Sequence, residues 1–382
     1  MKHYDAIVVG VGGVGSAALY HLAKRGAKVL GLDRFAPGHD RGSSHGRSRL
    51  IRRGYFEGSQ YVPLIDEAWK LWEDLAEQRK QPLLEKVGLI HVGPTDGAVL
   101  QGVRTSAKDH SVAIEEWSPA EARSHLNGFT IPDEMTTLFE KEAGILDVER
   151  CTEGYAEEAI QLGAELRIGA TVRHWTAKGS GVSVETESGL FTADNLVVTV
   201  GPWAKDLLLD LCIPFEVRRK PAYWYEPTTE DYLYRNGAPA FVYDTPQGVF
   251  YGLPQLDDHG VKIAEHSHGQ RVPDPLAVDR SLDTTDQRRV EAFLESYLPG
   301  LKRRCLHHTV CMYTMSPDQH FVVDRHPETP NVVFAAGLSG HGFKFASVLG
   351  KVMADFVTTG KTDSPVGFLS SQREGLAFTD ID

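Results

Sequence analysis

Short apolar runs that end in glycine-rich turns are the main hydrophobic pattern of this chain. Residues 4–9 form such a run, which opens into the turn 10–15 and then into residues 16–24, whose apolar spacing predicts a helix. A second apolar run, residues 28–33, ends in the carboxylate of Asp33. A strand, a helix and a strand within about 30 residues are typical of a parallel α/β sheet.

The same order of strand, glycine turn and helix returns twice. Residues 184–200 predict two strands that close on a turn at Gly201, which a helix follows. Residues 331–336 predict a strand that leads through the turn 337–342 into a helix over residues 345–356. The remaining pattern predicts a helix over residues 61–75 and strands over residues 87–93, 217–225, 240–243 and 249–252.

We predict an α/β fold with two interleaved domains. A discontinuous, Rossmann-like dinucleotide-binding domain takes residues 1–83, 145–216 and 315–382. A β-rich, mixed substrate domain takes residues 84–144 and 217–314.

Composition and charge exclude several classes of protein. The chain has 382 residues, 41% of them hydrophobic, so it can bury a substantial core and differs from a disordered protein. It has 40 basic and 52 acidic residues, and the net charge of -12 disfavours general binding to nucleic acid. No apolar run approaches the roughly 20 residues that a membrane span needs.

The N-terminus and the cysteines indicate a cytoplasmic protein. The first apolar run breaks at once into glycines, which is unlike a secretory signal. The four cysteines are Cys151, Cys212, Cys305 and Cys311. They are not spaced as metal ligands are, and they are too few in a chain of this length to form a disulfide framework. We therefore expect free thiols, no metal and a reducing compartment.

The first glycine turn carries the strongest chemical signal. Gly10 permits a tight turn after the strand, Gly12 lets backbone amides approach a pyrophosphate, and Gly15 lets the helix pack on the strand. Asp33, 23 residues after Gly10, can accept hydrogen bonds from ribose hydroxyls. The motif predicts dinucleotide binding without distinguishing NAD from FAD.

A second signal is the loop 40–53, which concentrates arginines in an acidic protein. Arg49 and Arg52 stand on either side of Leu50 and Ile51, so both can face a site that core residues flank. Arginine suits bidentate binding of a carboxylate, and we predict that one or both line a cofactor or substrate site. The alternatives are a solvated charged face and a nucleic-acid patch, which the overall charge disfavours.

The third signal is the segment Cys-Met-Tyr-Thr that begins at Cys311. A lone cysteine is usually a small buried hydrophobe, and a covalent role is the alternative. Lys262, His266, His341 and Lys344 are equally ambiguous when each is taken alone.

Together these segments resemble the monomeric sarcosine oxidase family, which includes N-methyltryptophan oxidase and pipecolate oxidase. The resemblance runs from the turn at Gly10 to about Arg373. Its most specific pieces are Gly-Ser-Ser-His-Gly and Arg-Leu-Ile-Arg within residues 42–52, then residues 311–314 and 337–345, all in the family's order and spacing.

The resemblance implies that the Rossmann-like domain binds FAD, tethered through a thioether to Cys311. It implies that Arg52 and Lys344 hold a substrate carboxylate, with Tyr251 lining the pocket. It also implies that the Lys262 ammonium stabilises superoxide as oxygen is reduced. The catalytic residues implied are Lys262, Arg49, His266 and Tyr251. The cofactor-binding residues implied are Gly10, Gly12, Gly15, Asp33, Arg34, Ser43, His45, Arg49, Cys311, Thr314, Gly340, His341, Gly342 and Lys344.

The implied reaction is oxidation of a secondary (N-methyl) α-amino acid such as sarcosine or N-methyl-L-tryptophan. The products are an imine, then an amino acid and formaldehyde, with hydrogen peroxide from oxygen. Residues 44–49 are closer to the pipecolate branch and residues 337–350 to methyltryptophan oxidase, so an L-pipecolate or cyclic imino acid oxidase is the alternative. Trp224, Tyr223 and Tyr243 are either an aromatic wall for an indole or ordinary strand residues.

Three other functions stay open at this point. They are a flavin amino-acid dehydrogenase that uses a carrier instead of oxygen, an NAD-linked dehydrogenase, and a regulatory protein that senses a nucleotide. Family members are commonly monomeric, so we expect a monomer whose partners are a small amino acid and molecular oxygen, with no nucleic-acid or membrane partner.

Overall fold

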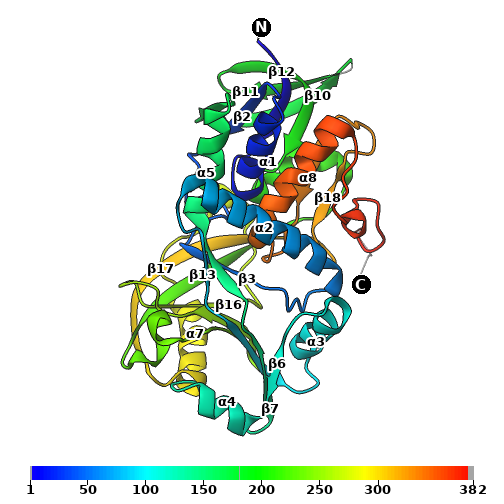
Figure 1. Cartoon of the computed structure of the whole chain (residues 1–382). Coiled ribbons are helices and arrows are strands. Elements are labelled where there is room, and N and C mark those ends of the chain that lie inside the picture. The colour runs from blue at the N-terminus through cyan, green and yellow to red at the C-terminus, as the bar shows by residue number, and fades with distance from the viewer. Residues whose placement is uncertain (1, 180, 377–382) are drawn as a thin grey trace.

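The structure is a computed structural model that describes residues 2–179 and 181–376. It has two lobes, each built around a large sheet, and helix α2 (Val62–Arg79) lies across the middle of the molecule (Figure 1). Residues 377–382 of the predicted dinucleotide-binding domain lie outside the described residues. The domain boundaries stay a prediction.

The first sheet has a parallel centre. β1 pairs in parallel with β2 and β12, and β12 pairs in parallel with β19. β2 and β19 are buried along their whole length, as strands covered on both faces are. The strands are β1 (His3–Val9), β2 (Val29–Asp33), β9 (Glu165–Ile168), β10 (Val172–Lys178), β11 (Gly181–Thr186), β12 (Gly189–Val198), β18 (Val322–Arg325) and β19 (Val332–Ala336).

Helices cover this sheet, and the glycine turns meet at one of its edges. α1 (Gly13–Lys24) packs against both α5 (Val148–Gln161) and α8 (Ala346–Thr359), side by side in the upper lobe (Figure 1). Because β1, β12 and β19 are parallel neighbours, the glycine turns that follow them lie together at their carboxyl ends. This is where α/β sheets bind ligands.

The second sheet is mixed, in the order β17-β13-β16-β15-β14-β5-β7-β6. Helices α4 (Pro119–His125) and α7 (Thr284–Tyr297) lie in the same lobe (Figure 1), and Phe293 of α7 stacks on Phe250 of the sheet at 4.5 Å. The strands are β5 (Leu89–Pro94), β6 (Glu115–Trp117), β7 (Met135–Glu140), β13 (Glu216–Pro227), β14 (Ala240–Thr245), β15 (Gly248–Leu253), β16 (Val261–Glu265) and β17 (Leu301–Met315).

A small third sheet and helix α3 complete the arrangement. β8 (Gly144–Asp147) pairs with both β3 (Ser48–Ile51) and β4 (Leu84–Lys86), so segments of both predicted domains share one sheet. α3 (Ala98–His110) packs against β5.

The helix predicted after Gly201 is present and short. A 3-10 turn over Gly201–Trp203 leads only into α6 (Ala204–Leu207). Leu208 leaves the helical region of the backbone, and Cys212 adopts a left-handed φ of 53°. The other predicted elements are present, with ends that differ by a few residues.

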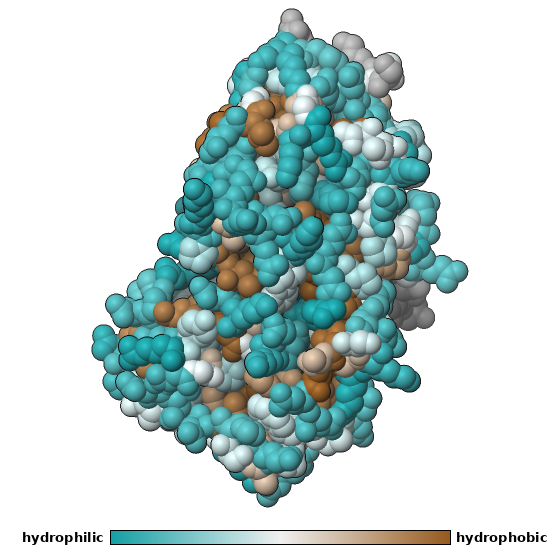
Figure 2. All heavy atoms as spheres, viewed as in Figure 1, coloured by the Kyte–Doolittle hydropathy of each residue, from teal (hydrophilic) through white to brown (hydrophobic). Residues whose placement is uncertain are grey.

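Within residues 2–179 and 181–376, every helix is too short or too polar to cross a bilayer. The face shown in Figure 2 is largely hydrophilic, and its apolar side chains appear mostly in recesses in the middle of the molecule.

Candidate active site

One large cavity extends from the glycine turns of the first sheet to the inner face of the second. Three of the predicted site residues do not line it, namely Gly15, His45 and Lys262. Those that line it are Gly10, Gly12, Asp33, Arg34, Ser43, Arg49, Arg52, Tyr251, His266, Cys311, Thr314, Gly340, His341, Gly342 and Lys344.

The three glycines of the first turn have different roles. A Cβ on Gly10 (φ 84°) would lie 2.6 Å from the carbonyl oxygen of Thr199, and one on Gly15 would lie 1.8 Å from that of Gly10. Gly15 is therefore a packing residue and does not contact the cavity. A Cβ on Gly12 would meet only Ser44 Oγ, at 3.9 Å, so the protein leaves space above this glycine. The N-cap residue Gly12 has no side chain to cap α1, and the amides at the start of a helix favour an anion there.

Unsatisfied polar groups continue along the cavity wall. Asp33 accepts hydrogen bonds from the amides of Val11 (2.6 Å) and Phe35 (2.8 Å), and burial raises the pKa of this carboxyl. Its remaining lone pairs suit ribose hydroxyls. Arg34 lies over the Trp203 ring at 5.4 Å, and its buried Nη1 has no partner among the described residues. This wall fits a dinucleotide.

The Cys311 thiol is in contact with a partly buried guanidinium. Arg49 Nη2 lies 3.2 Å from Cys311 Sγ and donates to the Ser43 carbonyl oxygen at 3.0 Å. Burial alone would lower the pKa of Arg49, but the nearby Cys311 and Tyr251 keep it raised. The thiol itself donates to the Ser43 carbonyl oxygen at 3.3 Å. Thr314 Oγ1 is buried without a partner in the described part of the chain, so it is available to a ligand.

Two cations share one aromatic ring at the other end of the cavity. Arg52 and Lys344 lie over the Tyr55 ring at 4.5 and 5.4 Å. Arg52 pairs with Glu57 at 2.6 Å. Burial by itself would raise the pKa of Glu57, but the guanidinium of Arg52 lowers it to about 2. Burial, with Arg52 nearby, lowers the pKa of Lys344 to about 7. When Lys344 is protonated, two positive charges face one carboxylate, which favours binding of an anion.

His341 holds Tyr55 in place. Its Nδ1 lies 2.6 Å from the Tyr55 hydroxyl, and its Nε2 lies 3.1 Å from the Gln319 carbonyl oxygen. Burial lowers the pKa of His341 to about 3, so the ring is neutral. The carbonyl requires the proton on Nε2, and Nδ1 then accepts from the phenol.

Alternation along the strands of the second sheet selects which side chains reach the site. Lys262 pairs with Trp224 and Tyr251 pairs with Ala264, so these side chains share the inner face. His266 follows β16 on the same face, and burial lowers its pKa to about 4. Tyr223 and Tyr243 instead pack into the core with Phe293 on the other face, so neither forms an aromatic wall.

Lys262 lies outside the large cavity. Its Nζ donates to the carbonyl oxygens of Gly46 (2.6 Å) and Ser48 (2.9 Å) and lies 5.2 Å from the Trp224 ring. Burial, with Arg49 nearby, lowers the pKa of Lys262 well below its usual value.

His45 lies beside Lys262. The two residues line a small separate cavity with Arg49 and Cys311. Burial lowers the pKa of His45 to about 3, and its Nε2 has no partner among the residues described.

Several site residues were missed by the sequence reading. Glu57 is only five residues from Arg52, and this charge spacing was the available signal. The Ser44 hydroxyl accepts from the amide of Gly13 at 3.2 Å, inside the motif already singled out. Lys220 donates to the His266 carbonyl oxygen at 2.7 Å and gave no signal in sequence.

Comparison with known proteins agrees with this geometry. A model of the family described as FAD dependent oxidoreductase matches residues 5–356. Monomeric sarcosine oxidase of Arthrobacter sp. (strain TE1826) is 37% identical over 379 residues, covering 98% of this chain and 97% of that protein. N-methyl-L-tryptophan oxidase of Salmonella heidelberg (strain SL476) is 36% identical over 367 residues, covering 94% and 96%. The chain belongs to the sarcosine oxidase and N-methyl-L-tryptophan oxidase family.

Because it belongs to this family, the protein is an FAD-dependent flavoprotein oxidase that acts on CH–NH donors. The NAD-linked and regulatory alternatives are therefore wrong.

Solved structures agree on the fold. NikD, described as an unusual amino acid oxidase essential for nikkomycin biosynthesis, has a TM-score of 0.85 at 24% identity over 97% of this chain and 98% of that one. Glycine oxidase from Geobacillus kaustophilus has a TM-score of 0.82 at 19% identity over 98% and 99%. The predicted α/β class, with a Rossmann-type FAD-binding part and a mixed β part, is confirmed.

Proposed function

We propose that this protein oxidises a small secondary α-amino acid, N-methylated or cyclic, at a carbon beside nitrogen and passes the electrons to molecular oxygen. The observation that carries the proposal is the pair Arg52 and Lys344 on one Tyr55 ring, where the Glu57 carboxylate pairs with Arg52. This arrangement lies in the same cavity as the glycine turns and Cys311.

The clamp binds the substrate through its carboxylate. Arg52 offers two donors to a carboxylate and Lys344 adds a point charge, so the amino acid displaces Glu57 from part of the guanidinium. Fixing the carboxylate at one end orients the carbon and nitrogen of the amine toward the Cys311 end of the cavity. His266, neutral at pH 7, lines the wall without repelling the amine.

FAD, when bound, accepts the two electrons and passes them on. The Gly12 turn and Asp33 would hold its dinucleotide part, and Thr314 its ring system. We propose that Cys311 tethers it, because its sulfur lies in the same cavity as the glycine turns and contacts Arg49 Nη2 at 3.2 Å. For an N-methyl substrate, one amine, one oxygen and one water give the demethylated amino acid, formaldehyde and hydrogen peroxide.

The size of the substrate follows from which aromatic residues reach the cavity. The aromatic residues that line it include Phe56, Tyr251 and Tyr313, whereas Tyr223 and Tyr243 are buried in the core on the other face of the sheet. Because these two tyrosines offer no wall for an indole, we propose sarcosine or L-pipecolate in preference to an indole-bearing amino acid. As with the relatives named monomeric, we propose that the chain acts as a monomer, and we place it in the cytoplasm.

The test is anaerobic mixing of the purified holoenzyme with sarcosine, L-pipecolate, L-proline and N-methyl-L-tryptophan in turn. We expect bleaching of the flavin absorbance by sarcosine or L-pipecolate, then one hydrogen peroxide per substrate when air is admitted. No bleaching by any of the four would overturn the substrate class. Bleaching without peroxide would instead indicate a dehydrogenase that uses a carrier.

A further inference from the structure

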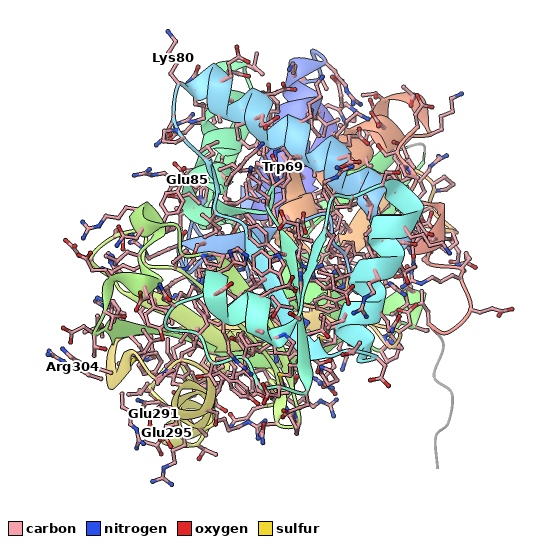
Figure 3. The ribbon with its side chains drawn as sticks, turned by 60° about the horizontal axis from the view of Figure 1, so that its bottom comes forward. Trp69, Lys80, Glu85, Glu291, Glu295 and Arg304 are labelled. Atoms are coloured by element: carbon pink, nitrogen blue, oxygen red, sulfur yellow. The ribbon has the colours of Figure 1, made fainter. Side chains whose placement is uncertain are left out.

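A third cavity opens at the surface on the far side of Lys262 from the small cavity that holds Arg49 and Cys311. Leu83, Leu146, Leu253 and Leu256 are among its lining residues, and charged side chains such as Asp147 and Arg150 line it as well. It lies where β4, β8 and β15 come together, and Glu85 of β4 is part of its rim. Figure 3 shows Glu85 just beyond the end of α2 that Lys80 marks.

Lys262 and Trp224 form the inner end of this cavity. Lys262 lines both the surface cavity and the small cavity, so one side chain separates the two spaces. The small cavity shares Arg49, Tyr251 and Cys311 with the large one. Three cavities therefore follow one another from the surface, past Lys262, to the reaction site.

Exposed ion pairs lie at the rim of the cavity, among them Arg150 with Asp147 at 3.4 Å. Arg47 pairs with Asp257 at the rim, and both side chains are about half exposed, at 48% and 45%. Arg47 has a left-handed φ of 69°, and its amide donates to the Glu149 carboxylate. These constraints fix the backbone position from which the Arg47 side chain extends. An exposed pair of this kind contributes little stability and exchanges readily with water.

We propose that the surface cavity is the access route for molecular oxygen, separate from the path of the amino acid, with Lys262 at its inner end. Oxygen is small, neutral and apolar, so it partitions into a space lined by leucines. The amino acid fills the large cavity from the Arg52 side and leaves the route past Lys262 free. The inference rests on the proposed oxidase function and adds where its second substrate enters.

Xenon locates the route without using catalysis. Xenon is an apolar gas that occupies apolar cavities, so crystals of the holoenzyme pressurised with xenon should show density between Leu253 and Leu256. Leu256→Trp should remove that density by filling the space. Leu282→Trp is the matched control, because Leu282 has the same 43% exposure and does not line the cavity. Xenon found only in the large cavity overturns the proposal.

Kinetics then tests whether the route is used. Holoenzyme reduced photochemically, with no amine present, should react with oxygen about tenfold more slowly in Leu256→Trp than in the wild type or in Leu282→Trp. Anaerobic flavin reduction by the substrate should be equal in all three. An unchanged oxygen reaction in Leu256→Trp overturns the route even where xenon binds. Because photoreduction needs no substrate, this result is independent of whether the proposed substrate class is right.

Discussion

The guanidinium of Arg49 lies 3.2 Å from the sulfur of Cys311, where β3 approaches β17; Cys311 is buried and Arg49 is partly buried. Cys311 is the one cysteine among the described residues that lines the large cavity, while Cys151 is enclosed in the core of the first lobe. The contact therefore selects one thiol of four for chemistry.

Replacement of Cys311 by alanine should abolish the covalent tether. Acid precipitation of the wild-type holoenzyme should give a yellow pellet, and the Cys311→Ala pellet should be colourless because nothing else holds the flavin after unfolding. Cys305→Ala, which changes a cysteine outside the cavity, should stay yellow. A yellow pellet from Cys311→Ala would assign the link elsewhere.

Replacement of Arg52 by alanine should weaken substrate binding more than cofactor binding. Loss of charge-assisted hydrogen bonds worth about 1.5–3 kcal/mol should lower kcat/KM by about 10- to 150-fold. Flavin content, measured by absorbance, should not change. Arg53→Ala is the control, because Arg53 forms a half-exposed pair with Asp66 instead. Equal effects of the two variants would remove Arg52 from the clamp.

Binding of a simple carboxylate should depend on the charge of Lys344. Burial lowers the pKa of this group to about 7, so it is protonated below pH 7 and loses its charge as pH rises through that value. The dissociation constant of acetate, followed by perturbation of the flavin spectrum, should therefore rise between pH 6 and about 8.5. Lys344→Arg should bind acetate with little change across this range, since arginine keeps its charge. A parallel weakening in Lys344→Arg would assign the titration to another group.

The glycines at 12 and 15 should differ when each is changed to alanine. Gly15→Ala places a Cβ against the Gly10 carbonyl and should prevent stable folding, seen as a lost unfolding transition. Gly12→Ala meets nothing closer than 3.9 Å in the protein, so the apoprotein should unfold within about 1 kcal/mol of the wild type while FAD binding is lost. Retention of FAD by Gly12→Ala would show that the phosphates do not approach this turn.

Replacement of Lys262 by methionine should slow the oxygen reaction and spare the amine reaction. Removing one preorganised charge from a dry site costs about 10²- to 10³-fold in rate. Stopped-flow mixing of the reduced holoenzyme with oxygen measures this step, and anaerobic reduction by the substrate is the internal control. Slowing of both half-reactions would instead indicate a general distortion of β16.

Local backbone requirements made much of the fold predictable. The turns after β1, β12 and β19 contain glycines with positive φ, and that requirement is visible in sequence. The short length of the helix after Gly201 could not be predicted, because the breaks at Leu208 and Cys212 depend on backbone conformation that the residue types do not reveal.

Side-chain direction was harder to predict. Arg49 lies within β3 and Arg52 just beyond its end at Ile51, and both reach the large cavity because the strand alternation stops between them. Tyr223 and Trp224 are neighbours in β13 and lie on opposite faces of this strand. Because both faces of the strand are buried, hydrophobicity alone does not show which face is directed toward the site. The position of Lys262 between two cavities depends on packing of three sheets, which no spacing in the chain encodes.

The strand pairing of the second sheet limits which sequence changes this lobe can accept. Lys262, Tyr251 and Trp224 face inward only because β13, β15 and β16 are held in one register. Deleting a single residue from β16 would turn the ammonium outward to the α7 side and bring an isoleucine or valine in its place. Descendants of this chain can therefore change their chemistry by exchanging side chains on these strands, whereas changes in length are confined to the connections.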